Sequence, residues 1–407
     1  MTNTHSHPVH TFAPFSFLNP TTRYHPITPT PSLPKEEQEP SPPAPPLQDH
    51  GIYHIWRSRD NRKGRHAALV PRPTPGAEKM AAATVPRPTN SLAETLKGLA
   101  KMVTRFPVWD VSYDVAVVFT LGSIVWVINA FFVWLPLAAP STEFPGEADI
   151  GGGWTAFIGA TIFEFGSVLL MLEAVNENQT ACFGWALTSA LESAPHLHPL
   201  KDSCRHSHPN RKSWLSRIES KTSPTSSPTH SLPNSDVSTP LKRPDRTWLP
   251  TPTELTTHYL RELGFLACLA QFLGATVFWI SGFTALPQIS AALGTRAAQN
   301  GAYWLPQVVG GTGFVVSSLL FMVEVQERWY IPAPSLLGWH VGFWNLVGAI
   351  GFTLCGALGF GEDGGGPVEY ALTLSTFVGS WAFLIGSVVQ WYESLDKYPV
   401  LVGEVPF

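Results

Sequence analysis

Glu164 is the residue of this 407-residue chain whose position most favours chemistry. It is the single charged residue of the apolar stretch 154–172, and its place in that stretch predicts a carboxyl group near the middle of a membrane. An acid at such depth is costly and usually faces a cavity or a partner. Polar residues of other apolar stretches could join it in an intramembrane site: Asn129, Gln271 and Asn345 are the leading candidates, and Gln307 and Gln390 are further ones. The alternative is a protonated glutamate that is hydrogen-bonded within a helix bundle.

Three further glutamates end a shared pattern of a small residue, a serine, any five residues and the acid. They are Glu173, Glu324 and Glu393. Each falls near the end of an apolar stretch, where the negative end of the helix macrodipole disfavours an acid. The three acids could form a carboxylate ring that attracts cations. They could also be solvated or paired with Arg261, Arg328 or Lys397, and this second interpretation is favoured because charge at a membrane boundary costs little.

The elements that position these acids are six apolar stretches, each of about 20 residues and therefore long enough to cross a hydrocarbon core of about 30 Å. The predicted spans are 115–137, 154–172, 263–283, 303–323, 338–358 and 370–392. None shows the alternation of a barrel strand, so helices must satisfy the backbone hydrogen bonds within lipid. The predicted fold class is an all-α membrane protein with six transmembrane helices.

The spans repeat as three helical hairpins, within residues 106–180, 256–330 and 331–400. In each first helix a glycine precedes a small or polar pair by seven residues, and in each second helix the small-residue and serine pattern recurs. Small residues let helix backbones approach closely in lipid. The predicted packing positions are Gly122, Gly166, Ser167, Gly274, Ser317, Ser318, Gly348, Gly386 and Ser387.

Two long segments outside the hairpins are polar and rich in proline, serine and histidine. Residues 1–105 form a predicted disordered tail, and residues 181–255 form a predicted disordered insertion between the first two hairpins. Such composition cannot bury enough apolar surface to offset the entropy of ordering. A short helix is expected around residues 92–103, and residues 401–407 form a second tail.

The distribution of charge predicts the orientation. Twenty-five of the 26 lysines and arginines lie in the tails, the insertion or the loops on one side. The positive-inside rule places that side in the cytoplasm together with both termini. Charged residues make up only 14% of the chain and the net charge is −4, which favours a lipid bilayer as partner and argues against nucleic acid.

The sequence gives only a weak indication of a metal site and none of an active site. The insertion contains histidines and a cysteine that could bind zinc or copper, but their spacing fits no closed structural site. They are His196, His198, Cys204, His206 and His208. No phosphate-binding glycine loop, zinc-protease motif or nucleophile elbow is present, so neither an enzyme nor a cofactor is predicted.

The third hairpin, with GSWAFLIGSVVQWYESLDKYPV at residues 379–400, resembles the YrhK-like membrane domain and a family of uncharacterised fungal multi-pass integral membrane proteins. The likeness covers about residues 107–400. It implies a membrane location and paired helices, and it implies no active-site residue.

Two functions follow as hypotheses. The first is a transporter or channel for a small solute or cation, suggested by Glu164 and the repeated hairpins. The second is a scaffold or lipid-organising protein that recruits cytoplasmic partners through residues 1–105 and 190–250. An intramembrane enzyme is a third and weaker hypothesis.

Overall fold

The structure is a computed structural model in which residues 22–27, 52–71, 89, 91–108, 110–177, 249–361 and 366–403 are described. Six of its helices are long and apolar enough to cross a membrane, which confirms the predicted all-α fold with six spans. The protein is therefore a multi-pass membrane protein. Most of the insertion, including the five candidate metal ligands, lies outside the described residues.

Five predicted spans each fall within one helix, the span 303–323 begins in the π-helical turn just before its helix, and the helices form three hairpins. The hairpin pairs are α4 (Val111–Ala138) with α5 (Gly153–Val175), α9 (Leu263–Thr284) with α12 (Leu305–Val325), and α13 (Leu337–Gly359) with α14 (Pro367–Leu395). Short helical turns precede or connect them: η2 (Pro140–Thr142), η3 (Glu147–Gly152), α8 (Pro252–Thr257), η4 (Tyr259–Arg261), α10 (Pro287–Ala292), α11 (Arg296–Gln299) and η5 (Asn300–Trp304). The second helix continues a π-helical turn in the first two hairpins, η3 before α5 and η5 before α12.

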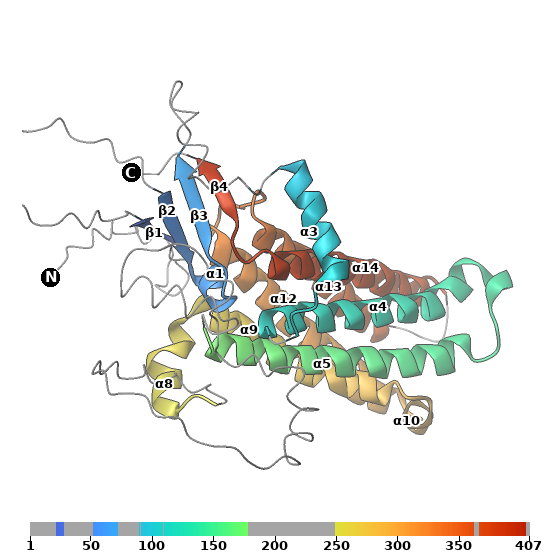
Figure 1. Ribbon diagram of the computed structural model, residues 1–407. Coiled ribbons are helices and arrows are strands. Elements are labelled where there is room, and N and C mark those ends of the chain that lie inside the picture. The colour runs from blue at the N-terminus through green and yellow to red at the C-terminus, as the bar shows by residue number, and fades with distance from the viewer. Residues whose placement is uncertain are drawn as a thin grey trace, which may run out of the picture.

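The six long helices form a closed ring by their contacts, and Figure 1 shows them running along a common direction. Each packs on the next in chain order, and α14 closes the ring by packing on α4. Glycines permit the closest approaches: a Cβ atom at Gly274 would lie 2.9 Å from the carbonyl oxygen of Gly310, and one at Gly351 would lie 2.6 Å from that of Ser375. All nine small residues named as packing positions are buried. Close backbone contact therefore holds the ring together, as lipid-embedded helices require.

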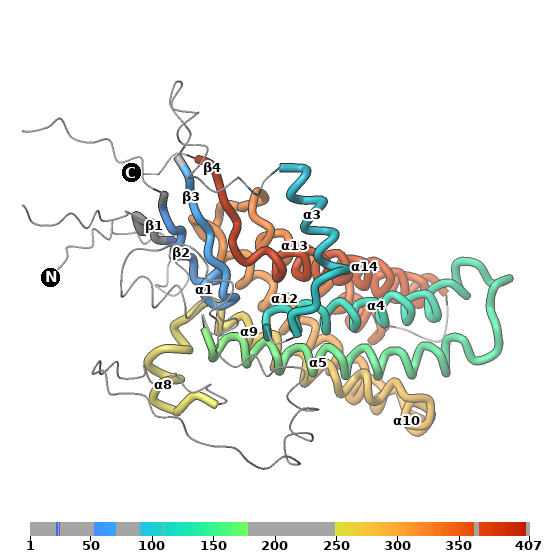
Figure 2. The backbone as a smooth tube through the Cα atoms, viewed as in Figure 1, coloured from blue at the N-terminus to red at the C-terminus, as the bar shows by residue number. Residues whose placement is uncertain are grey.

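A four-stranded sheet covers one end of the ring, which we call the sheet end; the opposite end is the far end. Its strands are β1 (Thr22–Ile27), β2 (Ile52–Arg57), β3 (Ala67–Pro71) and β4 (Val400–Gly403), in that spatial order. β1 and β3 run antiparallel to β2, whereas β3 and β4 are parallel, with Ala68 opposite Val400. Figure 2 shows the blue strand β3 beside the red strand β4, so the sheet joins segments from both ends of the chain.

The expectation that residues 1–105 are disordered apart from one short helix is therefore wrong for the described part of the tail, which also forms three strands. Besides three strands, this part contains α1 (Ser58–Arg62) and α3 (Leu92–Thr104), of which α3 confirms the expected short helix. Tyr53 and Ile55 of β2 pack with Ala67 and Leu69 of β3 in a small buried core. β4 completes the sheet from the other end of the chain and packs Leu401 against this core, so the whole sheet could not be expected from the tail alone.

Candidate functional site

A short basic segment of the tail inserts into the sheet end of the ring. This segment, residues 58–65, consists of α1 and the turn after it, and we call it the plug. The Arg62 guanidinium donates to Glu173 of α5 over 2.7 Å and to Glu324 of α12 over 2.8 Å. One side chain therefore joins the first two hairpins.

The third hairpin is joined to the plug by two arginines. Arg59 donates to Glu393 of α14 over 2.7 Å, and Arg65 donates to Glu393 over 3.1 Å and to Asp60 over 3.0 Å. The Lys63 amine lies 3.9 Å from Glu173. The result is a cluster of four cations and four carboxylates, called here the charged cluster: Arg59, Arg62, Lys63, Arg65, Asp60, Glu173, Glu324 and Glu393.

The charged cluster is almost entirely shielded from solvent. Glu173, Glu324 and Glu393 are 0%, 2% and 1% exposed, and Arg62 is 2% exposed. Burying each ion costs several kcal/mol, so the cluster is stable only while every charge has its partner. The three acids therefore do not form an open carboxylate ring. Nor do they pair as suggested with Lys397, whose amine binds Asp110 over 2.7 Å.

Glycines provide the space for the two arginines. A Cβ atom at Gly338, in the first turn of α13, would collide with Nε of Arg59. A Cβ atom at Gly264 of α9 would collide with Glu324 and lie 2.8 Å from Nε of Arg62. Since each glycine precedes the repeat glycine of its helix by ten residues, the same position is small in both hairpins. The ring is shaped to receive the plug.

Burial and neighbouring charges shift the pKa values of the plug in different directions. Burial lowers the pKa of the Lys63 amine to about 8, although Glu173 opposes this shift. Burial also acts to lower the pKa of Arg62, but Glu324 and Glu173 outweigh it, so this pKa lies well above its usual value. Nearby, burial raises the pKa of the Asp110 carboxyl group despite the adjacent Lys397 amine. Lys63 is therefore the cation of the plug most easily neutralised.

We expect the folded protein to become more stable as pH rises from about 8 towards 10.5, the ordinary pKa of lysine. In this range folded Lys63 loses its proton while unfolded Lys63 keeps it. The unfolding free energy then rises by up to about 1.4 kcal/mol per pH unit. Thermal unfolding midpoints across this range would show the slope, and Lys63→Met should flatten it. Equal slopes for the two proteins would contradict the prediction.

An aromatic cluster fills the axis of the ring nearer its middle. Each of the six helices contributes one buried ring: Trp126, Phe163, Phe278, Phe314, Phe352 and Phe383. Neighbouring ring centroids are close, for example 4.8 Å between Trp126 and Phe352 and 5.3 Å between Phe352 and Phe383. No continuous opening along the axis can pass through such close-packed rings.

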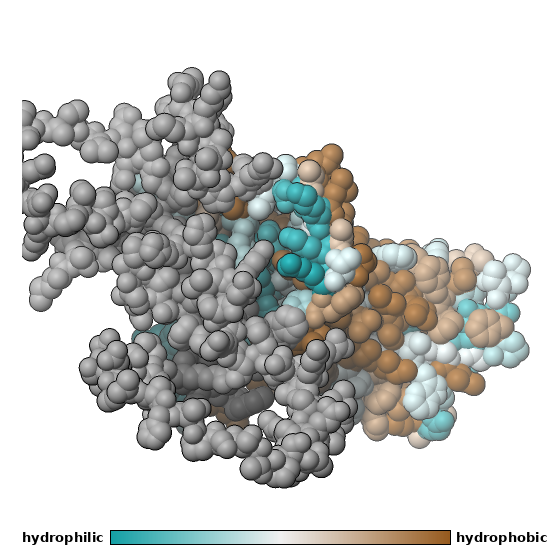
Figure 3. Space-filling view, in the orientation of Figure 1, coloured by the Kyte–Doolittle hydropathy of each residue, from teal (hydrophilic) through white to brown (hydrophobic). Residues whose placement is uncertain are grey.

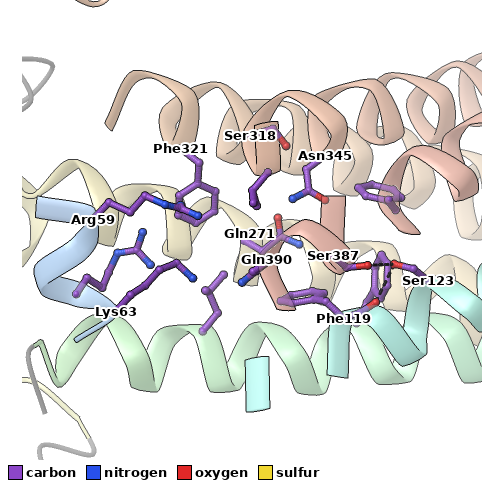
Figure 4. Close-up of a pocket in the computed structure, with 15 residues that line it drawn as sticks. Arg59, Lys63, Phe119, Ser123, Gln271, Ser318, Phe321, Asn345, Ser387 and Gln390 are labelled. Carbon is purple, nitrogen blue, oxygen red and sulfur yellow. Dashed lines mark hydrogen bonds between the residues drawn. The ribbon is translucent and has the colours of Figure 1, made fainter. Parts of the chain in front are cut away.

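A cavity with polar and apolar lining residues lies between the charged cluster and the aromatic cluster. Figure 4 shows Arg59 and Lys63 at one end of the cavity and Ser123 and Ser387 at the other. Phe163 and Phe383 of the aromatic cluster also line it. The cavity has a volume of about 40 Å³ for the centres of water-sized molecules. That is room for about three water molecules.

Three amide side chains line the middle of this cavity, and their hydrogen-bonding groups indicate what the cavity can hold. They are Gln271 of α9, Asn345 of α13 and Gln390 of α14. None of the three amides forms a side-chain hydrogen bond with another residue in the described part of the chain, whereas Gln307, outside the cavity, donates to the carbonyl oxygen of Phe352. Gln390 is buried, whereas Gln271 and Asn345 are half-buried. Each amide has donors and an acceptor that a water molecule or another small polar molecule in the cavity can satisfy.

The structure separates the four leading residues that the sequence suggested as one intramembrane site. Gln271 and Asn345 line the cavity together. Asn129 is distant from it, because its amide donates to the carbonyl oxygen of Gly152 over 2.7 Å at the far end of the ring. Glu164 accepts a hydrogen bond from exposed Thr276 over 3.0 Å on the outer surface between α5 and α9. Glu164 is thus no part of the cavity.

The plug and the aromatic cluster were not predicted from the sequence, although the aligned hairpins contained a signal for the aromatic cluster. Aligning the hairpins places aromatic residues four positions after each of the glycines Gly122, Gly274 and Gly348, at Trp126, Phe278 and Phe352. For the plug the signal was the basic run of residues 57–65 between two short apolar segments.

No family model, no curated protein and no solved structure matches this chain. The resemblance to the YrhK-like domain therefore stays a prediction.

Proposed function

We propose that the six-helix ring carries a small polar solute across the membrane along its axis, with the cavity as the central binding site. The observation that supports this function best is the group of three amides without protein partners inside a membrane-embedded cavity. Polar groups of this kind are costly in a membrane interior and usually mark a solute pathway. The structure corresponds to a closed state, with the plug on one side of the cavity and the aromatic cluster on the other.

The lining favours a neutral or anionic solute over a cation. Arg59, Arg62 and Lys63 contribute to the wall of the cavity, and its other polar groups are amides and hydroxyls. The acids of the charged cluster are engaged by the plug, so they offer no open cation site. Amide groups can donate and accept hydrogen bonds, which suits solutes such as urea, formamide or a small carboxylate.

The proposed orientation puts the plug in the cytoplasm. The positive-inside rule supports this arrangement, because the sheet end and the segments connected to it contain nearly all lysines and arginines. A solute that enters from the far end would then meet the aromatic cluster before the cavity, and release into the cytoplasm would require the plug to move.

A scaffold function is the second proposal, and the sheet supports it. β1 is an edge strand in the described part of the chain, with β2 on one side. Edge strands can accept an added strand from a partner. Deleting residues 195–250 or replacing residues in β1 should then change the set of proteins recovered with the full-length chain. Recovery of the same set would argue against a scaffold.

Removing single amides from the cavity tests the transport proposal. We expect Asn345→Leu and Gln271→Leu to lower solute uptake by the full-length protein in liposomes by up to about tenfold each, since a net hydrogen bond contributes about 0.5–1.5 kcal/mol. Osmotic swelling with urea, formamide and formate measures the uptake.

Glu164→Gln provides the matched control. It also replaces a polar residue within a span, but its side chain lies outside the cavity and glutamine can still accept from Thr276. Uptake should therefore stay at the wild-type rate. Uptake no faster than in protein-free liposomes for every solute would contradict transport, and a loss in Glu164→Gln alone would move the site to the outer surface.

A further inference from the structure

The helix α3 has one fully apolar side that no described part of the chain covers. This side consists of Leu92, Leu96, Leu99 and Val103, which are 77%, 57%, 49% and 70% exposed. Their spacing of four, three and four residues places them on one face of the helix. Exposed apolar residues that form a continuous face indicate an interaction surface.

The opposite side of α3 is polar, and its packing fixes the helix against the ring. A Cβ atom at Gly98 would lie 2.5 Å from the ring of Tyr392 in α14, so α3 rests closely on that helix. Met102 is buried in the same region. Tyr392 is adjacent to Glu393 of the charged cluster. α3 is therefore held at the sheet end, at the level where the spans end.

The orientation of α3 fits a membrane surface. Figure 1 shows that α3 runs across the direction of the spans, whereas the six long helices run along it. Figure 3 shows the hydrophilic side of α3 next to a hydrophobic side that continues into the hydrophobic surface of the spans. Exposed Phe106 and Val108 extend the apolar face towards α4. A helix with these properties lies in the interfacial region of a bilayer.

We propose that α3 is a membrane-surface helix whose apolar face inserts among the lipids of the leaflet at the sheet end. The occupant of the face is lipid, because the face is continuous with the surface that the six spans present to the bilayer. A soluble protein partner would need a surface that reaches this boundary between lipid and water.

The charges of α3 indicate that this docking does not depend on anionic lipid. Lys97 pairs with Glu94 over 2.6 Å on the helix itself. Lys101 acts electrostatically on Asp396, just after α14. Because both lysines already have acidic neighbours, the apolar face supplies the attraction, and binding in purely zwitterionic lipid should be as deep as in a mixture with anionic lipid.

Fluorescent labels on neighbouring residues of α3 test the proposal in the full-length protein. The four native cysteines are replaced by alanine, and an NBD label is attached to Leu96→Cys or Val103→Cys on the apolar face, with Lys97→Cys or Lys101→Cys as matched controls. In phosphatidylcholine nanodiscs with doxyl-labelled lipid, we expect quenching at positions 96 and 103 to be about threefold stronger than at 97 and 101. Adding anionic lipid should leave this ratio unchanged.

Three outcomes would overturn the inference. Equal quenching at all four positions would mean that α3 does not lie with one face in lipid. Labels at 96 and 103 that are shielded from both lipid quencher and water would identify a protein partner or a second copy of the chain on this face. Quenching that appears only with anionic lipid would show that charge, and not the apolar face, drives the docking. Each outcome is independent of whether the ring transports a solute.

Discussion

Replacing Arg62 with methionine should destabilise the protein by about 3–5 kcal/mol, the cost of breaking a buried ion pair by removing one partner. Arg62 donates to Glu173 and Glu324, and neither acid has access to water that could replace it. Glu324 would lose its ion-pair partner, while Glu173 would keep only the more distant Lys63. Unfolding in mixed micelles with increasing denaturing detergent measures the change.

Two further variants show whether the cost comes from unpaired charge. Arg57→Met removes the arginine just before the plug, which is partly exposed and lies 3.9 Å from Asp60, so it should cost less than about 1 kcal/mol. In the triple variant Arg62→Met, Glu173→Gln, Glu324→Gln the two stranded acids are neutral. Lys63 loses its neighbour Glu173, but because its pKa is already lowered to about 8 it can lose its proton at little cost, so most of the lost stability should return. A triple variant no more stable than Arg62→Met would mean that Arg62 acts by packing and not by charge.

The spans and hairpins could be predicted from the sequence because lipid leaves few alternatives. An uncharged stretch of about 20 residues must be helical within a bilayer, whatever its neighbours are. The small residues at Gly122 and Gly274 could be assigned to packing for the same reason, and both are buried. Each of these predictions depends on local composition and not on distant contacts.

The sequence could not show which side of each helix faces the axis. The spans are apolar all round, since one side meets lipid and the other meets the ring, so no amphipathic pattern marks the inner face. Glu164 and Gln271 were both predicted at membrane depth, yet Glu164 lies on the outer surface and Gln271 in the cavity. The depth of a residue in the membrane follows from its position along a span, whereas the direction in which its side chain points follows from how the helices pack.

The plug was unpredictable for a different reason. The tail is expected to be disordered because it has little apolar surface to bury, but the plug is held by ion pairs with acids from three hairpins. Arg62 and Glu324 are 262 residues apart in the chain, and Arg59 and Glu393 are 334 apart. The placement of three acids at the ends of helices implies compensating cations, but no local sequence pattern identifies which cations they are.

Removing the plug should open the cavity to reagents from the sheet end. The test variant lacks residues 1–79 and contains Glu173→Gln, Glu324→Gln and Glu393→Gln, so that no unpaired acid remains buried. A cysteine in place of Asn345, in a chain whose native cysteines are alanine, reports access to the cavity. We expect a small anionic thiol reagent to modify this cysteine about 100-fold faster than in the full-length chain, corresponding to ~2.7 kcal/mol of closing free energy.

A cysteine at Thr312 separates this opening from a general loosening of the ring. Thr312 is exposed on the outer side of α12, so its reactivity should be the same with and without the plug. The aromatic cluster stays in place, because its six rings contact one another and not the plug. Removal of the plug should thus give access to the cavity from the sheet end alone, and a reagent added at the far end should remain slow. Equal reactivity at position 345 with and without the plug would mean that the charged cluster stabilises the fold but does not close a pathway.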